Sequence, residues 1–235
     1  MLGIAALAGC SATVGGSAVP QSASPRQLAA VLPSSSDVSR IAGNPLSDNG
    51  SAPYQGGIDV LPNGIRDNDT ARPIDCLGPV SPFMRIVYEK GDVVGAAWQE
   101  FSRYGTGQAV SSVDAGVVQF GSPQDAQRMF AAFADRWKAC QGTTVTIALH
   151  NAENAELYEK VTDVRIDGTR LTSVIVNSDN QGGAQFPTER AIEVAGDCIV
   201  DVDVAVTAES PGQAPAAERA AGIARLMAEN VVRAR

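Results

Sequence analysis

Residues 110–142, VSSVDAGVVQFGSPQDAQRMFAAFADRWKACQG, place a strand pattern and a helix pattern on either side of one short turn. Residues 110–120 are rich in β-branched residues, and both alternating faces are partly apolar, which predicts a strand. Ser122 is a favoured N-cap residue, and Pro123 suits the first helical position. The apolar residues that follow recur every three or four positions as far as Cys140, which predicts an amphipathic helix.

Further strand patterns lie on both sides of this stretch. Residues 93–104 predict a strand that forms a hairpin with residues 110–120, because a short glycine-containing turn separates the two β-prone runs. The later predicted elements are strands at 143–149, 160–166, 170–176 and 190–206, the last broken by a turn at 195–197, and a final helix at about 215–232. Consecutive strands with one central and one C-terminal helix predict an α+β domain with a mainly antiparallel sheet and helices packed on one face.

The region before residue 74 has a less regular pattern. Ser34 and the polar residues after it predict the start of a short helix that carries Val38 and Ile41 and stops at Gly43. Residues 43–73 are rich in Gly, Pro, Asn and Asp, which predicts an extended loop with at most one weak strand. Composition alone therefore predicts a domain start near Ile74.

Composition narrows the classes of function. A hydrophobic content of 44% in 235 residues is enough for a folded core. The net charge of -8 argues against nucleic acid or an anionic membrane surface as the main partner. With one histidine and no Cys-x-x-Cys pair, the chain lacks the usual equipment for a multi-histidine zinc site, a zinc ribbon or thioredoxin-type chemistry. We therefore predict no metal, no cofactor and no catalytic residues.

The N-terminus matches the signal of a bacterial lipoprotein. Residues 1–9 read MLGIAALAG and are interpreted as a signal-peptide remnant, although no Lys or Arg precedes Arg26. Leu7-Ala8-Gly9-Cys10 fits a lipobox, whose cysteine is acylated and becomes the mature N-terminus, so we predict lipidation of Cys10 and a membrane anchor. Residues 10–25 are predicted to be the lipidated cysteine and a flexible, uncharged tether. The alternative is a frayed apolar terminus in which Cys10 has no role.

Three cysteines are left for disulfides if Cys10 is acylated. Outside the cytoplasm disulfides persist, and three thiols allow three single pairings. We favour Cys76–Cys140, which would close a loop of roughly 60 residues. Cys140–Cys198 is the alternative. In the favoured pairing, Cys198 is a small buried hydrophobic residue in an apolar strand.

Few residues are candidates for chemistry or binding. His150 follows a predicted strand but accompanies no known hydrolase motif, so we expect a structural or solvated residue. Asp201 and Asp203 point to the same side of a predicted strand; we expect a solvated sheet face, and an acid pair is the alternative. Trp98 and Tyr104 also share one face of a strand and form the candidate ligand cleft, with core packing as the alternative.

Several motifs, in their order and spacing, resemble the extracellular sensor domain of the mycobacterial serine/threonine protein kinase H, which many mycobacterial lipoproteins share. The motifs are Asp75-Cys76-Leu77-Gly78, the strand from Val113 to Phe120, the helix region from Ser122 to Gly142, Glu189-Arg190-Ala191-Ile192, Ile199-Val200-Asp201-Val202 and the upstream stretch from Asp37 to Gly43. The resemblance covers residues 26–235, which it implies are one sensor domain, and so moves the domain start upstream of Ile74.

The resemblance also has implications for disulfides and ligands. It implies an α+β domain with a cleft for an unidentified ligand and with disulfides in the periplasmic space. Cys76 and Cys140 match the family's first cysteine pair. The second pair falls near Thr188 and Ala205 here, which implies that this second bridge is lost.

The predicted function is a non-catalytic, lipid-anchored domain of sensor type. It would bind a small molecule or lipid in the cell-envelope space, on the outer face of the cytoplasmic membrane. A carrier or scaffold for envelope lipids or secreted partners is a second hypothesis, and a hydrolase with an unrecognised site is a third. A large apolar cleft would favour the first two, whereas convergent polar groups around His150 or the pair Asp201 and Asp203 would favour the hydrolase.

Overall fold

A computed structural model describes residues 27–234 except 104, 106, 150–153 and 208–216. In these residues nine strands form one antiparallel sheet in the order β1-β3-β4-β9-β8-β7-β6-β5-β2. The strands are β1 (Tyr54–Gly56), β2 (Ala71–Arg72), β3 (Val93–Ser102), β4 (Val110–Phe120), β5 (Thr144–Leu149), β6 (Ala155–Asp167), β7 (Arg170–Asp179), β8 (Phe186–Ala195) and β9 (Cys198–Val206).

The helices before residue 93 are short, and the two that follow are long. They are α1 (Ser35–Ala42), α2 (Leu77–Val80), α3 (Arg85–Tyr88), α4 (Pro123–Cys140) and α5 (Glu218–Arg233), with 3-10 turns η1 (Leu28–Val31), η2 (Ile58–Val60) and η3 (Ile74–Cys76). The α+β class, the central helix and the C-terminal helix are as predicted from the sequence. No described helix is both long and apolar enough to span a bilayer.

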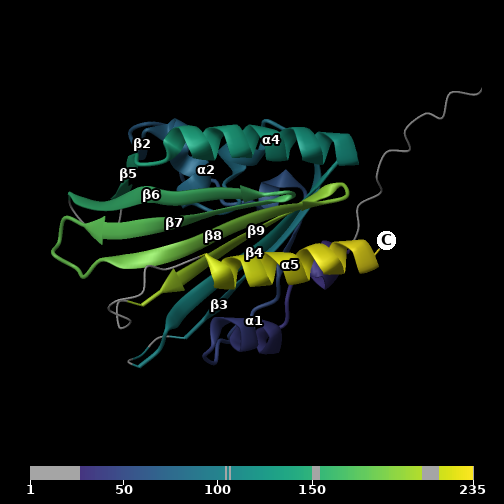
Figure 1. Ribbon diagram of the computed structural model, residues 1–235, viewed down its shortest axis with the longest axis horizontal. Coiled ribbons are helices and arrows are strands. Elements are labelled where there is room, and N and C mark those ends of the chain that lie inside the picture. The colour runs from purple at the N-terminus through teal and green to yellow at the C-terminus, as the bar shows by residue number, and fades with distance from the viewer. Residues whose placement is uncertain (1–26, 104, 106, 150–153, 208–216, 235) are drawn as a thin grey trace, which may run out of the picture.

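The two long helices lie on opposite faces of the sheet (Figure 1). On β9, Val200 and its even-numbered neighbours pack in the cluster that contains α5, whereas Ile199 packs in the cluster that contains α4. The expectation that the helices share one face is therefore wrong. Because side chains alternate along a strand, a strand that is apolar on both faces, as β4 is, needs a covering layer on each side.

α4 begins and ends as its sequence predicts. The Ser122 hydroxyl accepts a hydrogen bond from the Asp125 amide (3.1 Å), and Pro123 occupies the first turn, where its missing N–H costs nothing. The buried stripe of α4 consists of Ala126, Met129, Phe130, Phe133, Trp137 and Cys140. This stripe holds the helix against the sheet and against the segment that contains α2.

The N-terminal region belongs to the folded domain, which contradicts a domain start at Ile74. Leu28 and Val38 are buried in the cluster beneath α5. β1 forms one edge of the sheet against β3, and β2 forms the other edge against β5. The predicted loop at 43–73 thus supplies both edge strands, each too short to show an alternating pattern in the sequence.

The predicted Cys76–Cys140 disulfide is present, with Cα atoms 5.7 Å apart. It joins the end of η3 to the last residue of α4. Cys198 is buried at the start of β9, and its thiol takes no part in this bridge. Thr188 and Ala205 are direct cross-strand partners on β8 and β9, so the place where the resemblance puts a second bridge is one where two cysteines could meet.

Candidate ligand-binding cleft

A cleft of about 560 Å³ lies between α4 and the segment formed by residues 74–92. We call it the α4 cleft. Its apolar lining includes Ile86, Val87, Met129, Ala132, Phe133 and Trp137. A volume of this order and a mainly apolar lining are typical of small-molecule sites.

Charged side chains of both signs complete the lining of the α4 cleft. The bases are Lys90, Arg128 and Arg136, and the acids are Asp75, Asp92 and Asp125. Arg128 forms an ion pair with Asp125 on α4, and Arg136 lies 3.8 Å from Asp75 across the cleft. An apolar interior with charges beside it suits an amphipathic molecule better than a fully polar one.

The disulfide links one end of the cleft wall opposite α4 to α4 itself. Cys76 lies directly after Ile74 and Asp75, which line the cleft, and Cys140 follows Arg136 and Trp137 on the other wall. The covalent bond therefore fixes the distance between the two walls at this end.

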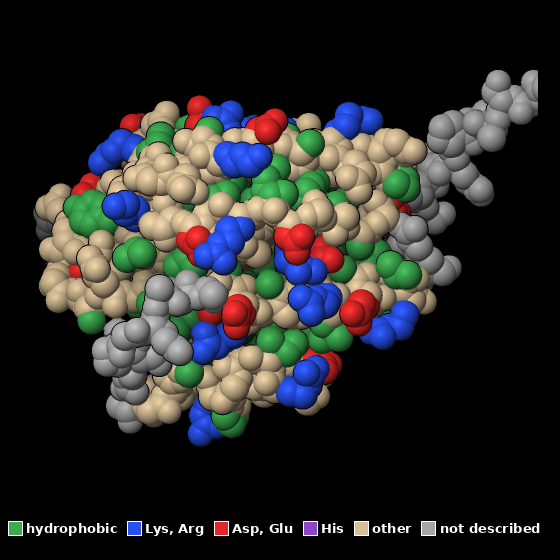
Figure 2. All heavy atoms as spheres, viewed as in Figure 1, with side chains coloured by type: hydrophobic (Ala, Val, Ile, Leu, Met, Phe, Trp, Pro, Cys, Tyr) green, Lys and Arg blue, Asp and Glu red, His purple; other side chains and the backbone are tan. Residues whose placement is uncertain are grey.

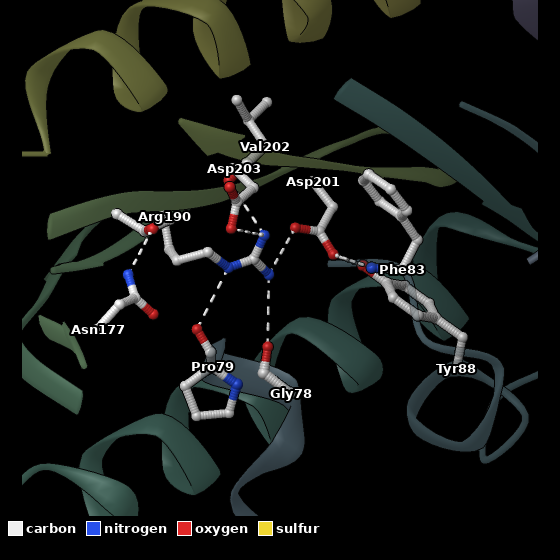
Figure 3. Close-up of polar contacts among 10 residues, drawn as sticks. Gly78, Pro79, Phe83, Tyr88, Asn177, Arg190, Asp201, Val202 and Asp203 are labelled. Carbon is white, nitrogen blue, oxygen red and sulfur yellow. Dashed lines mark hydrogen bonds and ion pairs between the residues drawn. The ribbon is translucent and has the colours of Figure 1, made fainter. Parts of the chain in front are cut away.

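A buried arginine holds the same wall from the sheet side. Arg190, on β8, has no exposed surface, and its Nε donates to the carbonyl oxygen of Pro79 (3.2 Å). Its Nη2 donates to the carbonyl oxygen of Gly78 (3.4 Å), and its Nη1 donates to that of Val202 (3.2 Å). Figure 3 shows the guanidinium lying between the α2 carbonyls and β9. Arg190 thus satisfies carbonyls at the end of α2 that would otherwise be buried without a donor.

Asp201 joins this arginine to the rest of the cleft wall. Its Oδ1 lies 2.9 Å from Nη2 of Arg190, and its Oδ2 accepts hydrogen bonds from the Phe83 amide (3.0 Å) and the Tyr88 hydroxyl (2.8 Å) (Figure 3). Burial, together with the neighbouring Asp201 carboxylate, raises the pKa of Tyr88 well above its ordinary value, so the hydroxyl remains a donor. The expectation of a solvated face at Asp201 is wrong, because α2 and α4 cover this face of the sheet.

Trp137 connects the buried charges to the cleft. The Arg190 guanidinium lies 5.6 Å from the centroid of the Trp137 ring, which is within cation–π range. The indole Nε1 of Trp137 is buried and has no hydrogen-bond partner among the described residues. A Cβ atom at Gly78 would lie 3.9 Å from this nitrogen and 3.3 Å from Val87, so the glycine allows the α2 backbone to approach α4 closely.

Trp98, one of the two residues proposed from the sequence as a ligand cleft, lies elsewhere. Trp98 stacks on the exposed Tyr54, with ring centroids 4.3 Å apart, and its Nε1 donates to the Val60 carbonyl (2.8 Å). Trp98 is not in the lining of the α4 cleft. Tyr104, Cys10 and His150 lie outside the described residues, so their predicted roles remain predictions.

The sequence interpretation missed Arg190 and Tyr88 as residues that build the site. The available signal for Arg190 was an arginine within a predicted strand, directly before Ala191-Ile192, because a charged side chain is almost never fully buried unless it is paired. Met129, Phe133 and Trp137 were identified only as a core stripe. Among the described residues, no group of three or more His, Cys, Asp or Glu side chains could hold a metal ion.

Taken together, the described residues define a disulfide-linked α+β domain with one apolar cleft between a helix and a wall fixed by buried charges. The sequence profile of the PknH-like extracellular domain family matches residues 23–230, and the chain belongs to this family. This family places the domain outside the cytoplasm.

Solved and curated relatives agree with this assignment. The crystal structure of the extracellular domain of PknH from Mycobacterium tuberculosis superposes with a TM-score of 0.69, at 22% identity, covering 92% of this chain and all of that one. The serine/threonine-protein kinases PknJ of Mycobacterium bovis and Mycobacterium tuberculosis are each 29% identical over 148 residues. The match covers 62% of this chain but only 24% of each kinase, so the chain corresponds to about a quarter of their length.

Proposed function

We propose that this protein is a non-catalytic, lipid-anchored domain of sensor type that binds an amphipathic small molecule or lipid in the α4 cleft. The observation that carries the proposal is the cleft of about 560 Å³, which is lined mainly by apolar side chains and lies between two walls fixed by the disulfide and by Arg190. A structure with no ligand role would gain stability by closing this gap with larger side chains.

Ligand binding can be tested by filling the cleft. Ala132 lines the cleft and is exposed, so Ala132→Trp would occupy the space without disturbing the buried stripe of α4. Ala131 is also exposed on α4 but is not part of the lining, so Ala131→Trp is the matched control. We expect a dansylated undecanoic acid to bind the wild type and Ala131→Trp equally, and Ala132→Trp about tenfold more weakly or not at all. Equal binding by both variants would place the ligand elsewhere.

Native mass spectrometry of protein purified from its own envelope would identify the natural ligand class. A co-purifying lipid in near-stoichiometric amount supports the second candidate function, a carrier of envelope lipids, which the same apolar cleft favours. A small molecule that is released on dilution supports the sensor function. Protein with no bound molecule, together with no binding of the fatty-acid probe, would contradict both.

The membrane anchor is proposed from the lipobox at Cys10. We expect Cys10→Ala to release the protein from the membrane fraction, because the acyl chains on this thiol would be the attachment. Unchanged retention of Cys10→Ala in membranes would show that another contact holds the protein there.

A further inference from the structure

One end of the α4 cleft contains a buried hydrogen-bond donor that no described residue satisfies. Trp137 lines the cleft and is 1% exposed, and its Nε1 has no hydrogen-bond partner among the described residues. The Arg190 guanidinium lies near the indole ring, but it has only donors and cannot accept the N–H. A buried indole N–H usually has an acceptor, because leaving it without one costs free energy.

The Nε1 atom of Trp137 lies beside the opposite wall of the cleft. A Cβ atom at Gly78 would lie 3.9 Å from Nε1 and 3.3 Å from Cγ1 of Val87, and both Gly78 and Val87 line the cleft. The nearby carbonyl oxygen of Gly78 already accepts a hydrogen bond from Arg190. Because Gly78 has no side chain and Val87 is half-buried, rotation of the Val87 side chain gives a ligand atom access to Nε1.

A second donor without an acceptor lies at the same end. Arg136 precedes Trp137 on α4 and also lines the cleft. Its Nη1 is 3.8 Å from Oδ2 of Asp75, which is too far for a hydrogen bond, and its side chain is 49% exposed. Arg128, near the other end of the cleft, differs because it donates a hydrogen bond to Asp125. An indole N–H and a guanidinium that both lack an acceptor match the two oxygens of a carboxylate.

The cleft beyond this pair of donors is apolar. Phe133 and Met129 follow Trp137 towards the start of α4, and the distance from Trp137 to Met129 along the helix is about 12 Å. Gly91 faces Met129 from the opposite wall, since a Cβ atom there would lie 3.6 Å from the Met129 sulfur. An alkyl chain that begins at the two donors would therefore lie between apolar groups over this length.

We propose that the α4 cleft binds a single-chain carboxylic acid in one direction. Its carboxylate accepts hydrogen bonds from Nε1 of Trp137 and from the guanidinium of Arg136, and its alkyl chain lies along α4 towards Met129. The proposal rests on the function proposed above and adds the chemical class of the ligand and its orientation. Asp75 is then a competitor of the ligand, because it is the alternative partner of Arg136.

Fluorescence titration with dansylated undecanoic acid and with its methyl ester tests this proposal near neutral pH, where the acid is ionised. We expect the wild type to bind the acid about tenfold more tightly than the ester. Arg136→Gln should remove this preference by weakening the acid about tenfold, and it should leave the ester unchanged because the ester has no charge. Asp75→Asn should tighten binding of the acid.

Lys138→Gln is the matched control for Arg136→Gln. Lys138 is exposed on the same turn of α4 and is not part of the cleft lining, so this variant makes the same change of charge outside the site. Trp137→Phe keeps an aromatic ring but removes the N–H, and it should weaken binding of both probes. Because Trp137 is buried, circular dichroism and urea denaturation would verify that this variant is folded; Arg136 is half-exposed, so Arg136→Gln tests the proposal without that risk.

The possible failures can be told apart. If Arg136→Gln binds the acid as the wild type does while Ala132→Trp does not bind it, the cleft binds an apolar chain but the proposed carboxylate contact is wrong. An equal loss in Lys138→Gln and Arg136→Gln would also contradict the contact, because it would show a general effect of charge. If the folded wild type binds neither the acid nor the ester, the function proposed above and this inference both fail.

Discussion

The two faces of the sheet differ in how tightly they are packed and in how their buried polar groups are satisfied. The face beneath α5 is filled with small apolar side chains such as Val200 and Ile223, and the buried Glu189 there accepts hydrogen bonds from the backbone amides of Arg219 and Ala220 at the start of α5. The outer surface over α5 carries acidic and basic side chains interspersed (Figure 2). Among the described residues, the buried Glu189 of this face is therefore satisfied by groups of the protein itself.

The face beneath α4 contains several buried charged groups and borders the α4 cleft. It holds the Arg190 and Asp201 ion pair, the carboxyl groups of Glu100, Asp114 and Asp203, the α4 cleft, and the Nε1 of Trp137, which has no hydrogen-bond partner among the described residues. Buried charge contributes little net stability, and side chains that line a cleft make fewer packing contacts than those in a closed core. We therefore propose that the α5 face contributes most of the stability and that the α4 face binds the ligand.

The largest expected effect is at Arg190. Arg190→Met would leave Asp201 buried without its cation and remove the donors to Gly78 and Pro79, so we expect a loss of about 4 kcal/mol in the free energy of unfolding. Urea denaturation would measure it. If Arg190→Met unfolds at the urea concentration of the wild type, the ion pair does not hold the cleft wall.

A cavity made on the α5 face should lower the free energy of unfolding by less than Arg190→Met does, and it should leave ligand binding unchanged. Ile223 has no exposed surface in the α5 cluster, so Ile223→Ala is expected to cost about 3 kcal/mol. Binding of the fatty-acid probe should be unchanged when it is measured without urea, at a temperature at which the variant is folded. A weakened affinity would show that the two faces are coupled and would break the division of roles.

An engineered disulfide between β8 and β9 tests the register of these two strands. Thr188 and Ala205 are direct partners, so Thr188→Cys with Ala205→Cys should form a disulfide and stabilise the domain by about 2 kcal/mol under oxidising conditions. Non-reducing peptide mapping and thermal unfolding with and without reductant would check this. Two free thiols in the folded double variant would contradict the register at these positions.

The buried carboxyls predict an unusual pH dependence. Burial raises the pKa of Glu159 to about 8, with Asp203 adding to the effect, and raises the pKa of Asp203 to about 8 and that of Asp114 to about 6. The folded protein therefore retains these protons at pH values where the unfolded chain has lost them. Unfolding releases protons, so the stability that these groups contribute is fully present below about pH 4, where the unfolded carboxyls are also protonated, and is lost as pH rises towards about 8.

We expect the melting temperature to be about 5 °C higher at pH 5.5 than at pH 8.5. The charges of Arg190, Asp201 and Glu100 act on the same groups, and the attraction to Arg190 opposes the shift without abolishing it. Glu159→Gln should reduce the difference. A melting temperature that is higher at pH 8.5 would mean that these carboxyls are ionised throughout.

The sequence predicted the elements whose signals are local. The Ser122 cap, Pro123 and the apolar stripe specified α4 within one stretch of chain, and the cysteine spacing narrowed the bridge to Cys76–Cys140 or Cys140–Cys198. The resemblance to the sensor-domain family then supported the first pairing. These signals do not depend on which distant segment packs nearby.

The site depends on partners that are far apart in the chain. The contact of Arg190 with Pro79 spans 111 residues, and that of Asp201 with Tyr88 spans 113, so no window of sequence contains both members. The choice of opposite faces for α4 and α5 likewise depends on the register of β8 and β9. Asp201 and Asp203 looked like a solvated face because the covering α2 is four residues long and has no periodicity of its own.

Hydrogen–deuterium exchange with and without the dansylated fatty acid tests the division between the two faces most directly. A ligand in the α4 cleft should slow the exchange of backbone amides in residues 74–92 and in α4, because it stabilises both walls. Exchange in α5 should remain unchanged. Protection confined to α5 and the strand residues that face it, with none in residues 74–92, would contradict the assignment of ligand binding to the α4 face.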